Sequence, residues 1–382
     1  MKNKKINIQI DKGNFTNKGA ELMLRAVMAH CRDVKGYNAI FVYGRGVAKP
    51  EEFRGAGMCQ IPEFNWHGIA LENRISGDVL QKYGLVKKKD IHVLLDAGGF
   101  QFGDQWVKKN HGTQTKWLED YYKSYKKNGT KIIFLPQAMG PFNSQDAKND
   151  LAVIVRYADL IFVRDDVSYK AVRELHPDAD NIQQSTDFTN LLEVSGEASG
   201  ENGYCFVPNS KMVTHTDTNV SSQYLDFMTT LIEHFANQGE RITLLNHEGP
   251  KDRALIDQIK EAVGSECDVK ILDGLSAEEV KQEIKKAKML VSSRFHGVVS
   301  GLCQGIPTFC TSWNHKYEEL LKDYDHSHGV LDVSKPEEAI TLIQQDVADI
   351  ESIRNKLLQK SKLYKDKTKA MWEIVDGLVF NY

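Results

Sequence analysis

The stretch Met289–Gly297 combines residue types that can bind and protonate a small anion. Its apolar start followed by two serines predicts a buried strand, a turn and the beginning of a helix. Ser292 or Ser293 is the expected N-cap, which leaves the first amide groups of the helix open to an anion. Arg294 can contact a carboxylate or phosphate with two hydrogen bonds, and His296 can transfer a proton near neutral pH. The alternative is that Arg294 pairs with a neighbouring acid and that His296 is a satisfied buried histidine.

Two further cations follow predicted strands. Arg164 comes directly after an apolar run and is expected to face the same cleft as Arg294. An equal alternative is a capping network in which Asp165 or Asp166 caps the next helix, which leaves Arg164 without a role. Lys316 follows a strand near the end of the second half, where it is placed to reach a phosphate across the cleft.

Three turns in the first half carry glycines and polar side chains after predicted strands. The first turn lacks the spacing of a Walker loop or of a dinucleotide fingerprint, so a nucleotide is not indicated. Polar groups and close backbone approach in such turns suit the hydroxyl groups of a sugar, and simple turn formation is the alternative in each case. The candidate acceptor-binding residues in these turns are Asn14, Asn17, Asp96, Gly98, Gly99, Gln101 and Gln137.

His326 and His328, with Asp323 and Asp325 nearby, are the residues that most resemble a metal site. Neither a helical HExxH motif nor a zinc-finger spacing accompanies them. The sequence therefore favours a loop without a metal, and we expect no metal ligands and no cofactor.

The elements that position these residues alternate between short apolar runs and amphipathic helices, as in parallel sheets covered by helices. Expected strands are Ile6–Ile10, Ala39–Tyr43, Ile91–Asp96, Lys131–Pro136, Leu160–Arg164, Gly203–Pro208, Arg241–Asn246, Val269–Leu272, Met289–Ser292 and Thr308–Thr311. Expected helices are Ala20–Cys31, Thr115–Asn128, Gln145–Tyr157, Ser221–Gln238, Lys251–Val263 and Ser276–Ala287, with another opening near Arg294. The stretch Gly44–Lys89 shows no sustained period and is expected to be a loop.

A chain of 382 residues suits two domains. We expect an N-terminal Rossmann-like domain over 1–192, a linker over 193–203 that is rich in Ser, Gly and Glu, and a second Rossmann-like domain over 204–335. Helices over 336–382 are expected to pack back on the first domain. Ligands of open α/β folds bind at the carboxyl ends of the strands, so the expected site lies in a cleft between two doubly wound sheets.

Composition and charge limit the classes of partner. The net charge of -3 gives no overall positive field for a nucleic-acid backbone. No window of about 18 apolar residues is present, and the N-terminus lacks an apolar signal core, so a cytoplasmic location is expected. The basic run Lys87–Lys89 reads as a solvated loop or as a peripheral contact with the inner face of an anionic membrane.

Taken together, the motifs resemble those of the polysaccharide pyruvyl transferase family over most of the chain, in family order. They are Asn17–Ala20, Ala97–Phe100, Gln137–Pro141, Val163–Asp165 with Ser168, Ser293–Gly297, Gly305–Pro307, and Lys316 with Leu320. The resemblance implies two Rossmann-like domains in a GT-B-like arrangement. It also implies an enzyme that moves pyruvate from phosphoenolpyruvate onto two hydroxyls of a sugar, forming a cyclic ketal and releasing phosphate. The product would serve an exopolysaccharide or capsule, and the acceptor would be a polysaccharide or lipid-linked glycan precursor.

Carried over by position, the resemblance implies that Arg164, Arg294 and His296 hold phosphoenolpyruvate with the help of the Phe295 amide. With Lys316, these residues form the expected donor site, and Arg294 and His296 are the expected catalytic residues. The first turn departs from the family pattern, because Ala20 stands where an acid often follows the glycine. That departure puts a catalytic acid at this place in doubt.

Two other functions compete with this interpretation. The first is a GT-B glycosyltransferase that uses a nucleotide sugar, since a fold alone does not decide a function. Many such enzymes carry a glutamate that binds ribose where this chain has Ser300. The second is a carbohydrate-binding protein without catalysis, which would leave the two arginines and the histidine unexplained.

Overall fold

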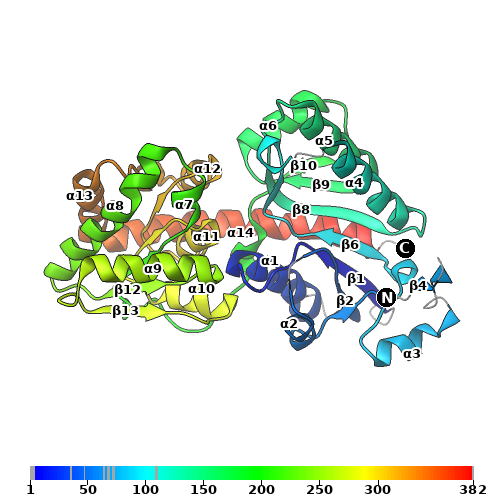
Figure 1. The fold of residues 1–382 in the computed structure, drawn as a ribbon, viewed down its shortest axis with the longest axis horizontal. Helices are drawn as coiled ribbons and strands as arrows, with labels where there is room; N and C mark the ends of the chain where they lie inside the picture. Colours follow the sequence, from blue (N-terminus) through cyan, green and yellow to red (C-terminus); the bar gives the residue numbers. More distant parts are fainter. Residues whose placement is uncertain are drawn as a thin grey trace. The chain divides into compact units, whose positions relative to one another are not determined.

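The computed structural model describes residues 5–34, 37–46, 48–62, 65–66, 69–70, 74–107 and 111–380. The chain forms two compact units, each built on its own parallel sheet (Figure 1). Unit 1 comprises Met1–Phe15, Met23–Phe188 and Lys367–Tyr382, and unit 2 comprises Thr16–Leu22 and Thr189–Asp366. The short segment Thr16–Leu22 thus groups with the second sheet although it follows the first strand closely. The domain limits at residues 192 and 203 stay predictions.

The sheet of unit 1 has the strand order β10-β9-β8-β6-β1-β2-β3, with β7 beside β8 and every pair parallel. Its strands are β1 Ile6–Asp11, β2 Ala39–Tyr43, β3 Cys59–Gln60, β6 Val93–Asp96, β7 Phe100–Phe102, β8 Lys131–Met139, β9 Leu160–Val163 and β10 Ile182–Gln184. The chain winds outward from β1 in both directions, so the strand order reverses between β1 and β6. This is the doubly wound order expected from the sequence, and ligands of such sheets bind beside the reversal.

Helices α4, α5 and α6 pack against the sheet of unit 1 around β8 (Figure 1). Helix α5 shows how the sequence sets its limits, because the Ser144 hydroxyl accepts a hydrogen bond from the Ala147 amide at 3.3 Å and Leu151 and Ile154 are fully buried. The helices of unit 1 are α2 Pro50–Gly55, α3 Gly77–Lys82, α4 His111–Lys126, α5 Gln145–Tyr157 and α6 Asp166–Leu175. Helix α1 Lys18–Ala29 begins in unit 2 and belongs to unit 1 from Met23 onward. A π-helix, η1 His30–Val34, extends α1, and 3-10 turns occur at η3 Lys88–Asp90, η4 Asp104–Trp106 and η5 Phe188–Leu191.

The expectation of a loop over Gly44–Lys89 is wrong. Helices α2 and α3, strand β3, the turn η3 and a small antiparallel pair, β4 Asn65–Trp66 with β5 Ile69–Ala70, occur within it. Each of these elements has at most six residues, which is too short for a hydrophobic period to be recognised. Positions 47, 63–64, 67–68 and 71–73 of this stretch lie outside the described residues.

The sheet of unit 2 has the order β13-β12-β11-β14-β15-β16, again with all pairs parallel. Its strands are β11 Tyr204–Val207, β12 Ile242–Leu245, β13 Val269–Leu272, β14 Met289–Ser292, β15 Thr308–Thr311 and β16 Val330–Leu331. The order reverses between β11 and β14, so the expected strand around Met289–Ser292 lies at the reversal of this sheet.

Alternate residues of these strands bury opposite faces of the sheet. Tyr204 and Phe206 pack with helices α8 and α9, whereas Cys205 and Val207 pack with α10. The helices of unit 2 are α7 Lys211–Thr214, α8 Thr218–Asn237, α9 Gly249–Val263, α10 Ala277–Lys285, α11 Phe295–Leu302, α12 Lys316–Asp323 and α13 Pro336–Ala348, with a 3-10 turn η6 at Ser327–Gly329.

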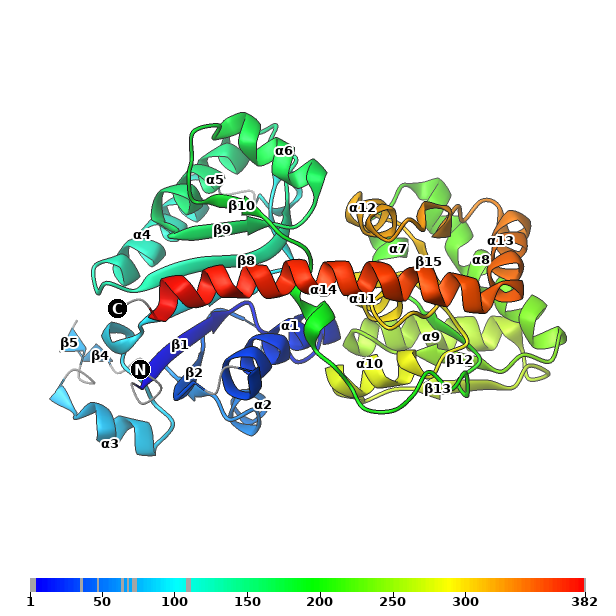
Figure 2. The same ribbon diagram turned by 180° about the vertical axis from the view of Figure 1, so that it is seen from behind.

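The last helix, α14 Ile350–Phe380, is one unbroken element (Figure 2). Its residues from Lys367 onward group with unit 1, where Trp372 stacks on His30 at 4.0 Å between ring centroids. None of the helices in the described ranges is long and apolar enough to cross a membrane.

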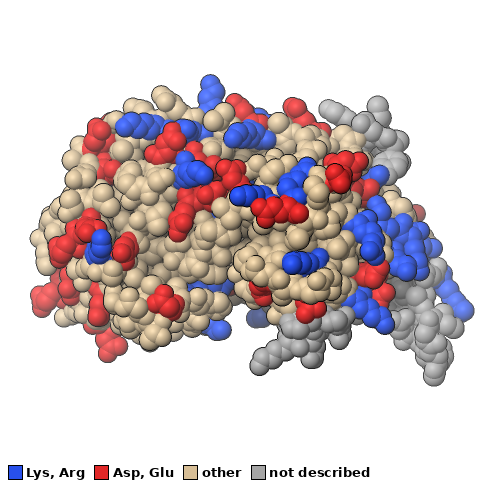
Figure 3. Space-filling view, turned by 90° about the horizontal axis from the view of Figure 1, so that it is seen from above, with Lys and Arg blue, Asp and Glu red and all other residues tan. Residues whose placement is uncertain are grey.

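The amino ends of the strands of unit 1 border a cavity of about 600 Å³. Apolar side chains such as Ile6 and Val86 line it together with Lys87 and Lys89 and with two carboxylates, Asp78 and Asp90. Lys and Arg side chains gather at the right-hand end of the face drawn in Figure 3, the end at which Figure 1 places the N-terminus and α3.

Candidate functional site

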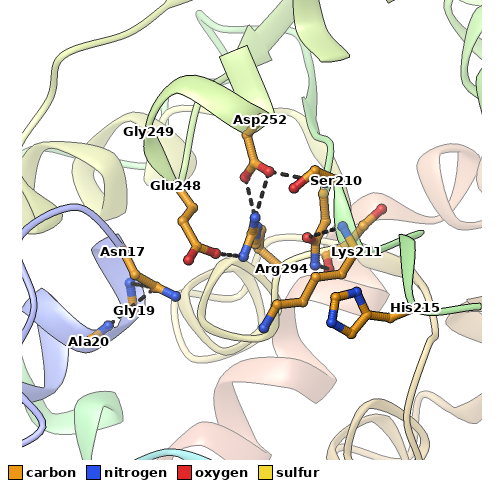
Figure 4. A network of polar contacts seen from close by, with 12 residues as sticks. Asn17, Gly19, Ala20, Ser210, Lys211, His215, Glu248, Gly249, Asp252 and Arg294 are labelled. Carbon is orange, nitrogen blue, oxygen red and sulfur yellow. Dashed lines mark hydrogen bonds and ion pairs between the residues drawn. The ribbon is translucent and has the colours of Figure 1, made fainter. Parts of the chain in front are cut away.

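Loops after three neighbouring strands of unit 2 bring the predicted donor residues to the carboxyl edge of the sheet. Lys211 follows β11, Arg294–His296 follow β14, and Lys316 follows β15. Lys211 and Arg294 therefore flank the reversal of strand order, which is where parallel sheets bind ligands. Figure 4 shows this region, with Arg294 at the centre of a polar network.

Arg294 is held in an internal ion pair. Its Nε donates to Asp252 Oδ2 at 2.8 Å, its Nη2 donates to Asp252 Oδ1 at 2.5 Å, and its Nη1 donates to Glu248 (Figure 4). These bonds use three of the five N–H groups of the guanidinium. This is the arrangement that the sequence left open as the alternative for Arg294.

Burial shapes the charges of this pair. Arg294 is 5% exposed and burial lowers its pKa to about 10, so it stays cationic at neutral pH. Burial also raises the pKa of Asp252 to about 6, although the Ser210 amide donates to its Oδ1 at 3.0 Å and favours the charged form. Asp252 and Glu248 come from α9 and the residue before it, more than forty residues from Arg294 in the chain.

The expected N-cap at Ser292 or Ser293 is wrong. Arg294 itself occupies the N-cap position of α11, without a capping side chain. The Ser292 hydroxyl accepts from the Arg294 amide at 3.1 Å and donates to the Arg294 carbonyl at 2.9 Å, so it braces the turn instead. The Ser293 hydroxyl bonds to Tyr224 and Thr311 at 2.6 and 2.7 Å in the interior of unit 2.

His296 lies against the first turn of α1. A β-carbon added at Gly19 would overlap Nδ1 of the His296 imidazole, so only glycine leaves room for the ring. Asn17 caps this turn, because its Oδ1 accepts from the amides of Gly19 and Ala20 at 2.9 and 3.4 Å (Figure 4). Asn17 therefore fills the role of turn former that the sequence weighed against sugar binding.

The loop after β12 also lies at the carboxyl edge of the sheet of unit 2. The His247 carbonyl accepts from the Lys18 amide at 3.1 Å, and an isolated bridge joins Asn17 to Glu248. His247 is buried, and burial together with the charges of Arg294, His296 and Lys18 lowers its pKa well below the usual value. It is therefore a neutral imidazole at physiological pH.

Two lysines flank one aromatic ring beside Arg294. Lys211 Nζ lies 5.0 Å from the centroid of the Trp313 ring, and Lys316 Nζ lies 4.9 Å from the same centroid. Lys316 also faces Phe295 at 5.2 Å. Burial and the charge of Arg294 lower the pKa of Lys211. The rings therefore contact both ammonium groups through cation–π interactions.

A second polar cluster occupies the strand reversal of unit 1. Arg45 Nε donates to Asp11 Oδ2 at 2.6 Å and its Nη2 donates to Asp96 Oδ2 at 2.9 Å. Both carboxylates are fully buried, and burial raises the pKa of Asp96 despite the opposing charge of Arg45. Tyr121 and Tyr122 complete the cluster through their hydroxyls.

Most of the predicted acceptor residues belong to unit 1 and share one chain of hydrogen bonds. Gln101 Nε2 donates to Asp96 and, at 3.1 Å, to Gln137 Oε1. The Gly98 amide donates to Asp96 Oδ1 at 3.0 Å, and the Gly99 carbonyl accepts from Ala138 at 3.1 Å. Asn14 is half-buried in the same unit, whereas Asn17 belongs to unit 2.

Arg164 belongs to unit 1 and is buried in an ion pair. Its Nη1 donates to Asp187 Oδ2 at 3.1 Å, and its amide donates to the Gln137 carbonyl at 3.0 Å. Asp165 caps α6 by accepting from the Ser168 amide at 2.8 Å, as the capping network predicted. That network leaves Arg164 engaged with Asp187, which no local pattern in the sequence indicates.

Sequence reasoning missed four residues of the site in unit 2: Lys211, Glu248, Asp252 and Trp313. Lys211 and Trp313 each follow a correctly predicted strand, so the rule that ligands bind at carboxyl ends was a sufficient signal for both. Asp252 lies within a helix and carries no such signal.

Comparisons with solved structures support the fold. A putative UDP-N-acetylglucosamine 2-epimerase from Listeria monocytogenes superposes with a TM-score of 0.61 at 12% identity, covering 99% of this chain and 98% of that one. HepE from Anabaena, in complex with UDP and glucose, gives a TM-score of 0.57 at 10% identity, covering 98% and 99%. An α-glucosyltransferase in complex with UDP and DNA gives 0.56 at 13% identity, covering 97% and 98%. The expected GT-B-like class of two parallel α/β domains is confirmed.

Sequence comparison identifies the family. A search of curated proteins gave no match. The family model described as polysaccharide pyruvyl transferase matches residues 17–315, a range that includes the capped turn at Asn17, the ion pair of Arg294 and the loop of Trp313. With that match over most of its length, the chain belongs to the polysaccharide pyruvyl transferase family, a family of enzymes.

Proposed function

We propose that this enzyme transfers pyruvate from phosphoenolpyruvate to two hydroxyls of a sugar, forming a cyclic ketal and releasing phosphate. The observation that carries the proposal is the convergence of Lys211, Arg294, His296 and Lys316 at the carboxyl edge of one sheet. A carboxylate and a phosphate on a three-carbon skeleton require several fixed cations close together. These four residues belong to unit 2, and the expectation that Arg164 of unit 1 also binds the donor stays a prediction.

In this proposal, different cations bind the phosphate and the carboxylate of phosphoenolpyruvate. Lys211 and Lys316 bind the phosphate, because their ammonium groups are held beside Trp313 and act as point charges. Arg294 offers its two remaining N–H groups to the carboxylate, while Asp252 and Glu248 hold the guanidinium in place. The Phe295 amide, in the first turn of α11, is proposed as a further donor to the anion.

The proposed reaction balances without a redox step. A proton adds to the methylene carbon of the enol ester, and positive charge develops at the neighbouring carbon that carries the phosphate. One sugar hydroxyl attacks that carbon, the carbon–oxygen bond to phosphate breaks, and the second hydroxyl closes the ketal. One hydroxyl proton replaces the proton that was consumed, and the other leaves with phosphate. His296 is the proposed proton carrier, since an imidazole can both donate and accept a proton.

The acceptor sugar is proposed to bind unit 1. Asp96, Gln101 and Gln137 form a connected set of donors and acceptors next to the strand reversal, with Gly98 and Gly99 allowing close approach of the backbone. The product is proposed to be a precursor of an exopolysaccharide or capsule. Amide and carboxylate side chains are the usual partners of sugar hydroxyls, and the buried Asp96 is fixed by Arg45.

The proposal is tested by incubating the protein with phosphoenolpyruvate and candidate glycans. Phosphate release that depends on the glycan, together with a gain of mass on the sugar, is the expected result. His296→Ala should lower turnover by about 10² to 10⁴ while the far-UV spectrum is unchanged. His234→Gln, on α8, is a matched control that should keep the wild-type rate. A wild-type rate for His296→Ala would remove His296 from the reaction.

Thermal-shift measurements with phosphoenolpyruvate and with nucleotide sugars distinguish the competing glycosyltransferase function. We expect stabilisation by phosphoenolpyruvate, because the candidate site offers several cations. A nucleotide sugar is not expected to bind, because the buried Ser300 on α11 stands at the position where many glycosyltransferases carry a glutamate that binds ribose. Stabilisation by a nucleotide sugar alone would contradict the proposal.

We also propose that the protein works in the cytoplasm and contacts the inner face of the membrane through unit 1. The cavity at the amino ends of its strands has apolar walls, and its three lysines, Lys5, Lys87 and Lys89, outnumber its two carboxylates, Asp78 and Asp90. This balance supports the proposal of an anionic lipid. Lys89→Glu should lower co-sedimentation with phosphatidylserine vesicles. Equal binding of the wild type and of Lys89→Glu to these vesicles would contradict a membrane contact here. Equal binding of the wild type to phosphatidylserine vesicles and to neutral vesicles would also contradict it.

A further inference from the structure

A second cluster of potential ligands lies in unit 2, in the loop before β16 and on α13. His326 and His328 precede β16, and Asp346 belongs to the last turn of α13. One ligand atom from each of the three residues lies within 4.8 Å of the others. The sequence paired the two histidines with Asp323 and Asp325, but the third member comes from a helix 18 residues further along the chain.

The distances fit a small tetrahedral ion. His326 Nε2 lies 3.5 Å from Asp346 Oδ2, and His328 Nε2 lies 2.9 Å from the same oxygen. Ligands about 2.1 Å from a tetrahedral zinc ion are separated from one another by about 3.4 Å. The two distances to Asp346 Oδ2 lie on either side of that value, and all three ligand atoms lie within 4.8 Å of one another.

The orientation of His326 is that of a metal ligand. It is 2% exposed, and its Nε2 has no hydrogen-bond partner among the residues that the structure describes, although a carboxylate lies beside it. Asp346 Oδ2 lies 3.5 Å from this nitrogen, so the ring of His326 presents Nε2 to the cluster. A buried ring nitrogen that faces a carboxylate and a second imidazole is placed as a metal ligand would be.

A buried lone pair next to a carboxylate is unfavourable unless a proton or a cation lies between them. The buried Phe309 ring contacts both imidazoles, with centroids at 5.7 and 6.3 Å, and limits the access of water from that side. His328 is 40% exposed and gives an ion a path from solvent. Two imidazoles and one carboxylate are a donor set typical of zinc and of similar divalent transition metals.

We propose that His326, His328 and Asp346 bind one divalent transition-metal ion of the zinc class, with water as the fourth ligand. The ion ties the short edge strand β16 to α13. It lies outside the residues of the proposed donor site, so it serves the stability of unit 2 and takes no part in the transfer reaction.

The test is a titration of the tag-free, chelator-treated full chain with Co²⁺, followed by visible absorption. We expect one equivalent to produce the intense band of tetrahedral cobalt, and one equivalent of Zn²⁺ to displace it. Asp346→Asn and His328→Gln should each weaken cobalt binding by more than about tenfold, the lower end of the effect seen for outer-shell partners.

Asp325→Asn is the matched control. Asp325 directly precedes His326 in the chain, but its carboxylate pairs with Lys360 at 2.5 Å. It should bind cobalt like the wild type. Both ligand variants keep the buried His326, and Asp346→Asn keeps the size of the buried Asp346 side chain. Chemical unfolding of each variant checks that it folds. The absence of a saturable band, or equal weakening by Asp325→Asn and Asp346→Asn, would overturn the proposal. A transfer rate that changes with zinc would contradict a purely structural ion.

Discussion

Gly19 faces the imidazole of His296 so closely that a methyl group at position 19 would overlap Nδ1 of the ring. Asn17 caps the same turn through the amides of Gly19 and Ala20, so the backbone there is fixed. The sequence motif around Asn17 and the motif around His296 are thus two sides of one packed contact within unit 2.

Gly19→Ala should therefore displace the His296 ring and lower turnover by about 10², because small errors in the position of a catalytic group are costly. The measurement is the steady-state rate of phosphate release with saturating phosphoenolpyruvate. Gly55→Ala, at the end of α2 with open space around the added methyl group, is the control. An unchanged rate in Gly19→Ala would mean that the position of this ring does not matter.

Arg294→Met should destabilise unit 2 by about 3–5 kcal/mol, because it leaves the buried Asp252 without its cation. The double variant Arg294→Met with Asp252→Leu should recover most of that stability, measured by chemical unfolding. If activity returns together with stability, Arg294 only supports the structure. We expect activity to stay low, because the proposed carboxylate contact is absent in both variants.

Lys316→Met keeps the apolar stem against Trp313 and removes the charge. The KM for phosphoenolpyruvate should rise about tenfold, which corresponds to about 1.4 kcal/mol of lost binding. Lys322→Met, on the exposed side of the same helix α12, should leave KM unchanged. Equal KM values for the two variants would exclude Lys316 from donor binding.

The buried His247 makes the stability of unit 2 depend on pH. Its pKa is lowered in the folded state, so below about pH 6.5 the unfolded chain binds a proton that the folded chain does not. Above pH 6.5 the imidazole is neutral in both states, so it does not lower the free energy of unfolding. Below pH 6.5 the free energy of unfolding falls by at most about 1.4 kcal/mol for each pH unit. The unfolding free energy between pH 7 and pH 5 should drop less in His247→Gln than in the wild type, while His234→Gln should match the wild type.

Local patterns in the sequence determined the sheets and the edge at which the donor residues lie. Strands such as Met289–Ser292 are buried on both faces, so they appear as continuous apolar runs, and a residue just after such a run must lie at the carboxyl edge. Arg294, His296 and Lys316 could be placed at that edge for this reason alone. The family resemblance added the identity of the donor as an expectation.

Tertiary structure alone decided which charges these residues meet. Arg294 pairs with Asp252 and Arg164 with Asp187 because a helix or turn from elsewhere in the chain packs over each loop. Nothing in the neighbouring sequence specifies such partners, since a buried arginine can be neutralised from any direction in space. The same reason applies to Asp346, which only the packing of α13 brings to the two histidines before β16.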